Sequence, residues 1–154
     1  MAQQFYHPVG VKPNMRIIVL AGASHVGKTT TLNKIAKYIL SQRGWKGGPN
    51  PPASVAKDEK YVLYNTRGIK VGISTEGDTS KCIHDGFSHF VANKCDVCFI
   101  ASKTSGCSVA QVEIESYPLA PMYVFLHNEH VRNYRTRNRS HIQANVVSQL
   151  YSLI

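Results

Sequence analysis

The segment spanning residues 16–42 constrains the fold of this chain more than any other part of the sequence. It contains the octapeptide GASHVGKT (22–29), which follows the apolar run RIIVLA (16–21) and overlaps the start of a stretch with helical spacing (27–42). The apolar run is typical of a strand buried on both faces, and the apolar residues of the later stretch recur on one face of a helix. The segment therefore predicts a strand, a glycine-bearing turn and a helix in direct succession.

The octapeptide fits the pattern G-x-x-x-x-G-K-[ST], in which each residue type has a physical reason. Glycines let backbone N–H groups curl around a phosphate, and the helix N-terminus adds a partial positive charge beneath it. Lys28 is placed to bridge two phosphates and Thr29 to offer its hydroxyl to Mg²⁺, whereas we interpret His25 as filling the loop. The candidate nucleotide-binding residues are Gly22, Ala23, Ser24, His25, Val26, Gly27, Lys28, Thr29 and Thr30.

With its flanking strand and helix, the segment 16–42 resembles the Walker A element of the P-loop NTPase superfamily, which includes small kinases. Over the rest of the chain the resemblance is one of architecture only. It implies a nucleotide-binding fold, bound ATP and Mg²⁺, and chemistry at the γ-phosphate.

The remaining sequence alternates between strand and helix signals. The expected elements are a hairpin (61–65 and 69–74), a helix (79–93), a strand (97–101), a helix at 105–116 where a strand is the alternative, a strand (122–126) and a helix (142–153). This β-α-(ββ)-α-β-α-β-α order predicts a three-layer α/β domain of the P-loop NTPase type, with a mostly parallel sheet and one hairpin strand.

Domain organisation follows from length and composition. The chain has 154 residues, of which 43% are hydrophobic, which is enough for one core. Residues 1–14 are expected to form an N-terminal arm and 15–154 a single domain. The stretch 43–60 is rich in Gly and Pro and predicts a flexible surface loop, in which Trp45 either pins the loop to the core or stacks on a nucleotide.

A carboxylate on the metal side is expected just beyond the carboxyl end of a strand. Asp78 is the first candidate and Glu76 the second, because both follow the expected strand 69–74. The alternative role for Asp78 is an N-cap of the helix that follows. Asp96 lies at the start of a strand, which is the wrong end for a ligand site.

The stretch 102–106 follows another strand and is expected to face the same crevice. It reads SKTSG and lacks the aspartate of a guanine-reading N/T-K-x-D motif, so ATP is expected rather than GTP. Lys103 is interpreted as a solvated loop lysine.

An arginine-rich segment, 128–141, follows the last expected strand. If it is helical, Arg132, Arg135 and Arg139 share a face, and Arg137 does not. Small P-loop kinases carry a similar segment as a lid, and arginine suits that role because its planar fork binds phosphate oxygens bidentately. A solvated basic face and a nucleic-acid contact patch are the alternatives.

The four cysteines, at 82, 95, 98 and 107, do not predict a metal site. Cys95 and Cys98 form a CxxC pair, but extended residues three apart point to opposite faces of a sheet. Buried structural thiols are therefore expected. No apolar run approaches the roughly 20 residues that span a bilayer, and the polar N-terminus has no signal-like run, so a cytoplasmic protein without a membrane partner is expected.

The net charge of +9 favours anionic partners. Together with the octapeptide it predicts a MgATP-binding, kinase-like phosphotransferase that acts on an anionic acceptor such as a nucleotide or a nucleic-acid component. Lys28, Asp78 and the three arginines of the shared face are the candidate catalytic residues, and Thr29, Asp78 and Glu76 are the candidate metal ligands. The alternative is a non-kinase ATPase or ATP-binding module whose basic surface holds nucleic acid or a protein partner.

Overall fold

The computed structural model describes residues 5–23, 27–50, 57–126 and 146–154 of the chain. A six-stranded sheet forms its centre, in the order β2-β3-β4-β5-β1-β6. The strands are β1 (Arg16–Ala21), β2 (Trp45–Gly48), β3 (Lys60–Asn65), β4 (Lys70–Ser74), β5 (Val97–Ser102) and β6 (Met122–Phe125). The helices are α1 (Lys28–Ser41), α2 (Ser80–Ala92) and α3 (Cys107–Ser116), and residues 146–151 are helical as well.

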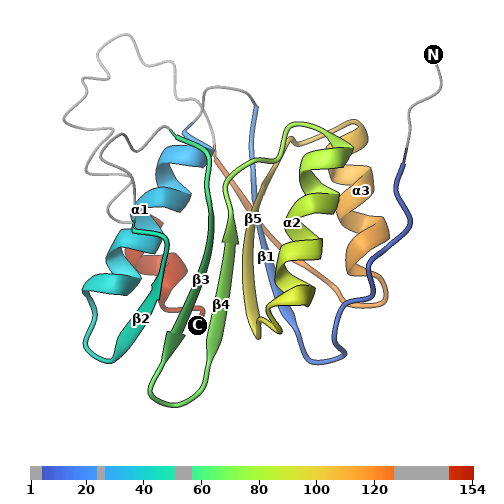
Figure 1. Ribbon diagram of the computed structural model, residues 1–154. Helices are drawn as coiled ribbons and strands as arrows, with labels where there is room; N and C mark the ends of the chain where they lie inside the picture. Colours follow the sequence, from blue (N-terminus) through green and yellow to red (C-terminus); the bar gives the residue numbers. More distant parts are fainter. Residues whose placement is uncertain (1–4, 24–26, 51–56, 127–145) are drawn as a thin grey trace, which may run out of the picture.

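The sheet is mixed, and the direction of its strands decides which residues meet at its edges (Figure 1). β1 pairs in parallel with β5 and β6, and β4 pairs in parallel with β5. β3 runs antiparallel to both β2 and β4. The carboxyl ends of β1, β4, β5 and β6 therefore lie at the same edge as the amino end of β3.

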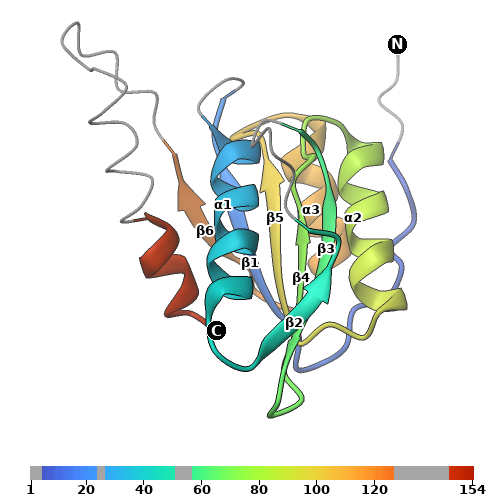
Figure 2. The same ribbon diagram turned by 60° about the vertical axis from the view of Figure 1, so that its left-hand side comes forward.

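Helices cover both faces of the sheet, as Figures 1 and 2 show: α1 and the helical residues 146–151 lie on one face, α2 and α3 on the other. Successive residues of β1 point to opposite faces, as the pleat of a strand requires. Ile18 and Leu20 pack in the core under α1, whereas Ile17 and Val19 pack in the core under α2 and α3. The α/β class expected from the sequence is confirmed.

The stretch 43–60 differs from the expected loop, because Trp45–Gly48 forms β2 at the edge of the sheet. The sequence suggests a loop here because glycine is a weak strand former. The pairing itself explains Gly47, since a Cβ at this position would lie 2.2 Å from the backbone oxygen of Val62 in β3. β3 therefore takes part in two antiparallel pairings, with β2 and with β4. Trp45 packs against the core under α1, as one of its two interpretations predicts.

Residues 5–14 are irregular but are held against α2 and α3. The side chain of Gln111 accepts from the backbone N–H of Tyr6 over 3.1 Å and donates to its carbonyl over 3.0 Å. The amide of Val9 donates to Glu115 over 3.0 Å, and the ring of Tyr6 stacks on His84. The arm is thus fixed by contacts with residues more than one hundred positions later.

The helix at 105–116, for which a strand was the alternative, is confirmed as α3. Among the described residues, no helix is long and apolar enough to cross a membrane.

Candidate functional site at the carboxyl edge of the sheet

Lys28 is the first residue of α1, and its ammonium group lies between the carboxyl ends of β1 and β5. Nζ donates to the carbonyl of Gly22 over 2.8 Å and to the carbonyl of Ser102 over 3.1 Å. Only 7% of the residue is exposed. Burial lowers the pKa of Lys28, and the nearby carboxylate of Asp78 acts in the opposite direction. The ammonium group of Lys28 is therefore held at the point where β1 passes into the glycine-bearing loop.

Asp78 forms an ion pair with Lys28, with 3.5 Å between Nζ and Oδ1, and its side chain is 59% exposed. The loop before α2 reaches this position because Gly77 lies against the end of β5. A Cβ at Gly77 would lie 1.8 Å from the backbone oxygen of Ala101, so only glycine fits there. The N-cap of α2 is Thr79, whose side chain accepts from the amide of Cys82, and so the alternative role for Asp78 is wrong.

The hydroxyl of Thr29 lies beside a carboxylate that the sequence analysis did not select. Thr29 Oγ1 donates to Asp58 Oδ1 over 3.1 Å, and Thr75 Oγ1 donates to the same oxygen over 3.1 Å. Thr29 Oγ1 also lies 3.4 Å from the carbonyl of Thr75. Asp78 contacts Lys28, whereas Asp58 contacts Thr29.

Asp58 reaches the site because β3 runs antiparallel to β4. Lys60, at the start of β3, pairs with Ser74, at the end of β4, so the residues that precede β3 lie at the carboxyl edge of the parallel strands. Thr75 fixes this approach by accepting from the amide of Glu59 over 2.8 Å. The only sequence signal was a mixed-charge run, KDEK (57–60), in a stretch interpreted as a loop.

The oxygens around Thr29 fit a hard divalent cation. Mg²⁺ is usually bound by one or two carboxylates together with waters and substrate phosphates. Thr29, Asp58 and the carbonyl of Thr75 supply oxygen donors of this kind. Within the described ranges, no group of three or more His, Cys, Asp or Glu side chains could hold a metal by itself. A cation here would therefore need further oxygens, such as those of a phosphate.

The amino end of α1 has free capacity for an anion. Gly27 has a φ of 93°, in the left-handed region, and no described side chain caps the helix. The first amides of the helix therefore have no side-chain acceptor among the described residues. Ala23 is exposed, Thr30 is half-buried in the first turn, and Ser24, His25 and Val26 lie outside the described residues.

The other predicted site residues are not brought together here. Glu76 is exposed on the loop before α2. Asp96 lies at the amino edge, as expected, where it accepts from the amide of Lys70 and pairs with Lys12. The bond from the Lys70 amide is the main cause of the lowered pKa of Asp96.

The arginine-rich segment lies outside the described residues. This covers Arg132, Arg135, Arg137 and Arg139.

Cys95 and Cys98 lie on the same side of the sheet, contrary to the geometric argument from the sequence. Both are buried in the core under α2 and α3. The argument fails because Cys95 precedes the strand and follows Lys94, whose φ of 55° turns the chain. The expected burial of this pair is confirmed, whereas Cys82 and Cys107 are partly exposed.

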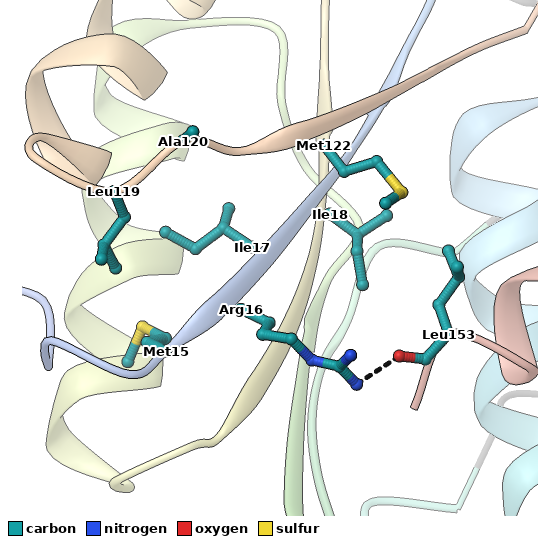
Figure 3. A pocket seen from close by; sticks show the side chains of 8 residues that line it. All are labelled: Met15, Arg16, Ile17, Ile18, Leu119, Ala120, Met122 and Leu153. Atoms are coloured by element: carbon teal, nitrogen blue, oxygen red, sulfur yellow. Dashed lines mark hydrogen bonds between the residues drawn. The ribbon is translucent and has the colours of Figure 1, made fainter.

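An apolar cavity of about 240 Å³ lies at the other end of β1 (Figure 3). Its walls come from β1, β6, the turn before β6 and the C-terminal residues, and the guanidinium of Arg16 donates to the carbonyl of Leu153 at its border. Neither a carboxylate nor a histidine lines it, so we assign it no chemistry.

No family model, no curated protein and no solved structure matches this chain. The function is therefore argued from the site alone.

Proposed function

We propose that this chain has a three-layer P-loop NTPase fold and binds ATP with Mg²⁺ at the carboxyl edge of its sheet. The observation that carries the proposal is the position of Lys28, whose buried ammonium lies between the ends of β1 and β5 at the start of a helix that no described side chain caps. A cation and free helix amides at one point form a strong phosphate site, because both favour negative charge.

The metal side of the proposed site is Thr29 with Asp58. The hydroxyl and the carboxylate are in contact at 3.1 Å, and Thr29 directly follows Lys28 in the sequence. They would hold Mg²⁺, which when bound neutralises charge on the β- and γ-phosphates. This revises the expected metal ligands, since Asp78 is paired with Lys28 instead.

Asp78 is suited to a different role in the proposed reaction. Its carboxylate is exposed on the crevice and stands beside the lysine that would contact the transferred phosphoryl group. From this position it would orient an acceptor hydroxyl or accept its proton while the γ-phosphoryl group moves to the acceptor oxygen and ADP leaves. Transfer to an anionic acceptor is the proposed reaction. Among the described residues that contact Lys28 and Thr29, Asp58 and Asp78 supply the carboxylates.

Nucleotide binding is tested by thermal shift. We expect MgATP to raise the melting temperature of the wild type and to raise that of Lys28→Ala much less. Lys103→Ala is the matched control, because it removes a lysine from the same edge that makes no contact with Gly22. A wild type that MgATP does not stabilise, or equal shifts in all three proteins, contradicts the proposal.

Turnover separates the proposed kinase from the alternative. A phosphotransferase forms ADP when a nucleoside monophosphate or a 5′-hydroxyl oligonucleotide is supplied and not otherwise. ADP formation that needs no acceptor identifies an ATPase, and binding without turnover in either condition identifies an ATP-binding module.

A further inference from the structure

A second, polar cavity of about 660 Å³ lies at the opposite edge of the sheet from Lys28. Three segments meet there: the turn between α1 and β2, the turn between β3 and β4, and the C-terminal residues. The two turns touch, because a Cβ at Gly44 would lie 3.5 Å from the hydroxyl of Thr66. The cavity therefore has walls that the fold itself fixes.

Two arginines line this cavity, one from each turn. Arg43 and Arg67 are exposed, and neither forms an ion pair with a carboxylate of the described residues. The turn that carries Arg67 is held by Asn65, whose Oδ1 accepts from the amides of Arg67 and Ile69 over 3.0 Å and 2.9 Å. No aspartate or glutamate lines the cavity. The lining of the cavity thus brings two guanidiniums and no acidic side chain together.

An aromatic wall completes the cavity. Trp45 is half-buried, and its indole N–H donates to the hydroxyl of Tyr151 over 3.2 Å. Tyr151 is held in turn by an edge-on contact with Tyr38, with ring centroids 5.1 Å apart. Aromatic side chains fixed in this way lose little freedom when they bind a flat ring.

α1, β2 and residues 146–154, which lie on one side of the cavity, contain no aspartate or glutamate. The first 57 residues contain no aspartate or glutamate, and the described C-terminal residues 146–154 contain none either. Asp58 and Glu59 lie at the other edge of the sheet, beside Thr29 and Thr75. Asp85 and Glu115 belong to α2 and α3, and Asp96, near the start of β4, is paired with Lys12. A polyanion that reaches the cavity from the side of α1 would therefore meet Arg43 and Arg67 and no acidic side chain of α1 or β2.

We propose that this cavity binds single-stranded nucleic acid, with Arg43 and Arg67 on backbone phosphates and a base against the aromatic wall. Stacking on aromatics beside a cationic groove is how proteins hold single strands without reading their sequence. An unstacked base presents its face to the wall, whereas a duplex does not. This site is separate from the proposed ATP site and does not depend on it.

Trp45 reports directly on this binding, because it is the single tryptophan of the chain. We expect a thymidine oligonucleotide of about 10 nucleotides to quench its fluorescence in a saturable way. Arg43→Ala with Arg67→Ala should weaken the binding at least about tenfold, and should lower the slope of log K against log salt by roughly 1.4 through the loss of two phosphate contacts.

The matched control removes the same charge elsewhere. Lys81→Ala with Lys94→Asn takes two positive charges from α2 and the turn after it, and asparagine suits the positive φ at position 94. We expect this control to bind within about twofold of the wild type by fluorescence anisotropy of a labelled oligonucleotide.

Three results would overturn the proposal. The first is oligonucleotide binding without a change in Trp45 fluorescence, which places the strand elsewhere. The second is equal weakening by the control pair, which leaves only general charge attraction. The third is quenching of equal affinity by inorganic polyphosphate or by a glutamate-rich peptide, which shows that no base is stacked. Near-ultraviolet circular dichroism of Trp45 in each variant checks that the wall is intact.

Discussion

Thr29 and Asp58 are hydrogen-bonded over 3.1 Å, and this contact joins the start of α1 to the segment that leads into β3. Thr75, just after β4, binds the same carboxylate oxygen. Three segments that are separate in the sequence therefore converge on one oxygen. If the proposed function is right, this oxygen lies on the metal side of the site.

Asp58→Asn is expected to raise the Mg²⁺ concentration needed for half-maximal stabilisation by ATP at least about tenfold, which corresponds to about 1.4 kcal/mol. The amide keeps the shape of the side chain but removes the charge that attracts a hard cation. Thermal shift at fixed ATP and varied Mg²⁺ measures this. Asp78→Asn should leave the Mg²⁺ requirement unchanged and lower turnover, and the reverse assignment of the two effects would contradict the roles proposed for the two carboxylates.

Gly77→Ala is expected to destabilise the protein by about 1–3 kcal/mol, the range for forcing extra atoms into a packed site. The added Cβ would lie 1.8 Å from the backbone oxygen of Ala101, and neither backbone can yield without moving the edge of the sheet. Urea unfolding measures the loss. Gly48→Ala is the control, because its nearest contact is 4.0 Å away, and a cost as large as that at position 77 would show that the close approach is not the cause.

Glu115 is expected to make stability depend on pH. Burial raises the pKa of Glu115 above its ordinary value of 4.5, while the Val9 amide, His84 and Gln111 act in the opposite direction. The folded state then holds this proton more tightly than the unfolded state. The contribution of Glu115 to the free energy of unfolding is therefore complete below about pH 4.5 and is lost as pH rises through the folded pKa.

Unfolding by urea at several pH values tests this against Glu115→Gln, which cannot titrate. The difference in stability between the wild type and the variant should fall as pH rises from acid towards neutral. A constant difference would mean that the carboxyl group titrates alike in both states.

The thiols are expected to react with a disulfide reagent in two classes. Cys82 and Cys107 are partly exposed and should react with the native protein, whereas Cys95 and Cys98 are buried and should react only on unfolding. The absorbance of the released thiolate, followed before and after denaturant is added, measures both classes. Immediate reaction of all four would place the buried pair at the surface.

Local patterns were enough to predict most elements of this fold. The apolar run before the octapeptide forms β1 with the expected bounds, and the helical spacing after it forms α1. These signals are strong because β1 is buried at every position after Arg16, as a continuous apolar run predicts, and the buried residues of α1 recur with the helical period. The hairpin of β3 and β4 was also predictable, since its turn carries Gly68 with a φ of 83°.

What the sequence did not predict depends on partners distant along the chain. Gly47 suggests a loop until the backbone of Val62 is seen to lie against it. Asp58 gains its position from the antiparallel direction of β3, and Cys95 meets Cys98 because the chain turns at Lys94. No local period encodes such relationships. The roles of Arg132, Arg135 and Arg139 stay predictions.

The pairing of β1 has a consequence for synthesis on the ribosome. β1 and the loop after it are made early, but both neighbours of β1 come after residue 96. A nascent chain that ends at residue 96 has two unpaired edges on this strand and lacks the Ser102 carbonyl that Lys28 binds. Contacts of such long sequence separation form slowly. The growing chain therefore carries this apolar strand unpaired until β5 emerges, and this interval is when a chaperone would bind it.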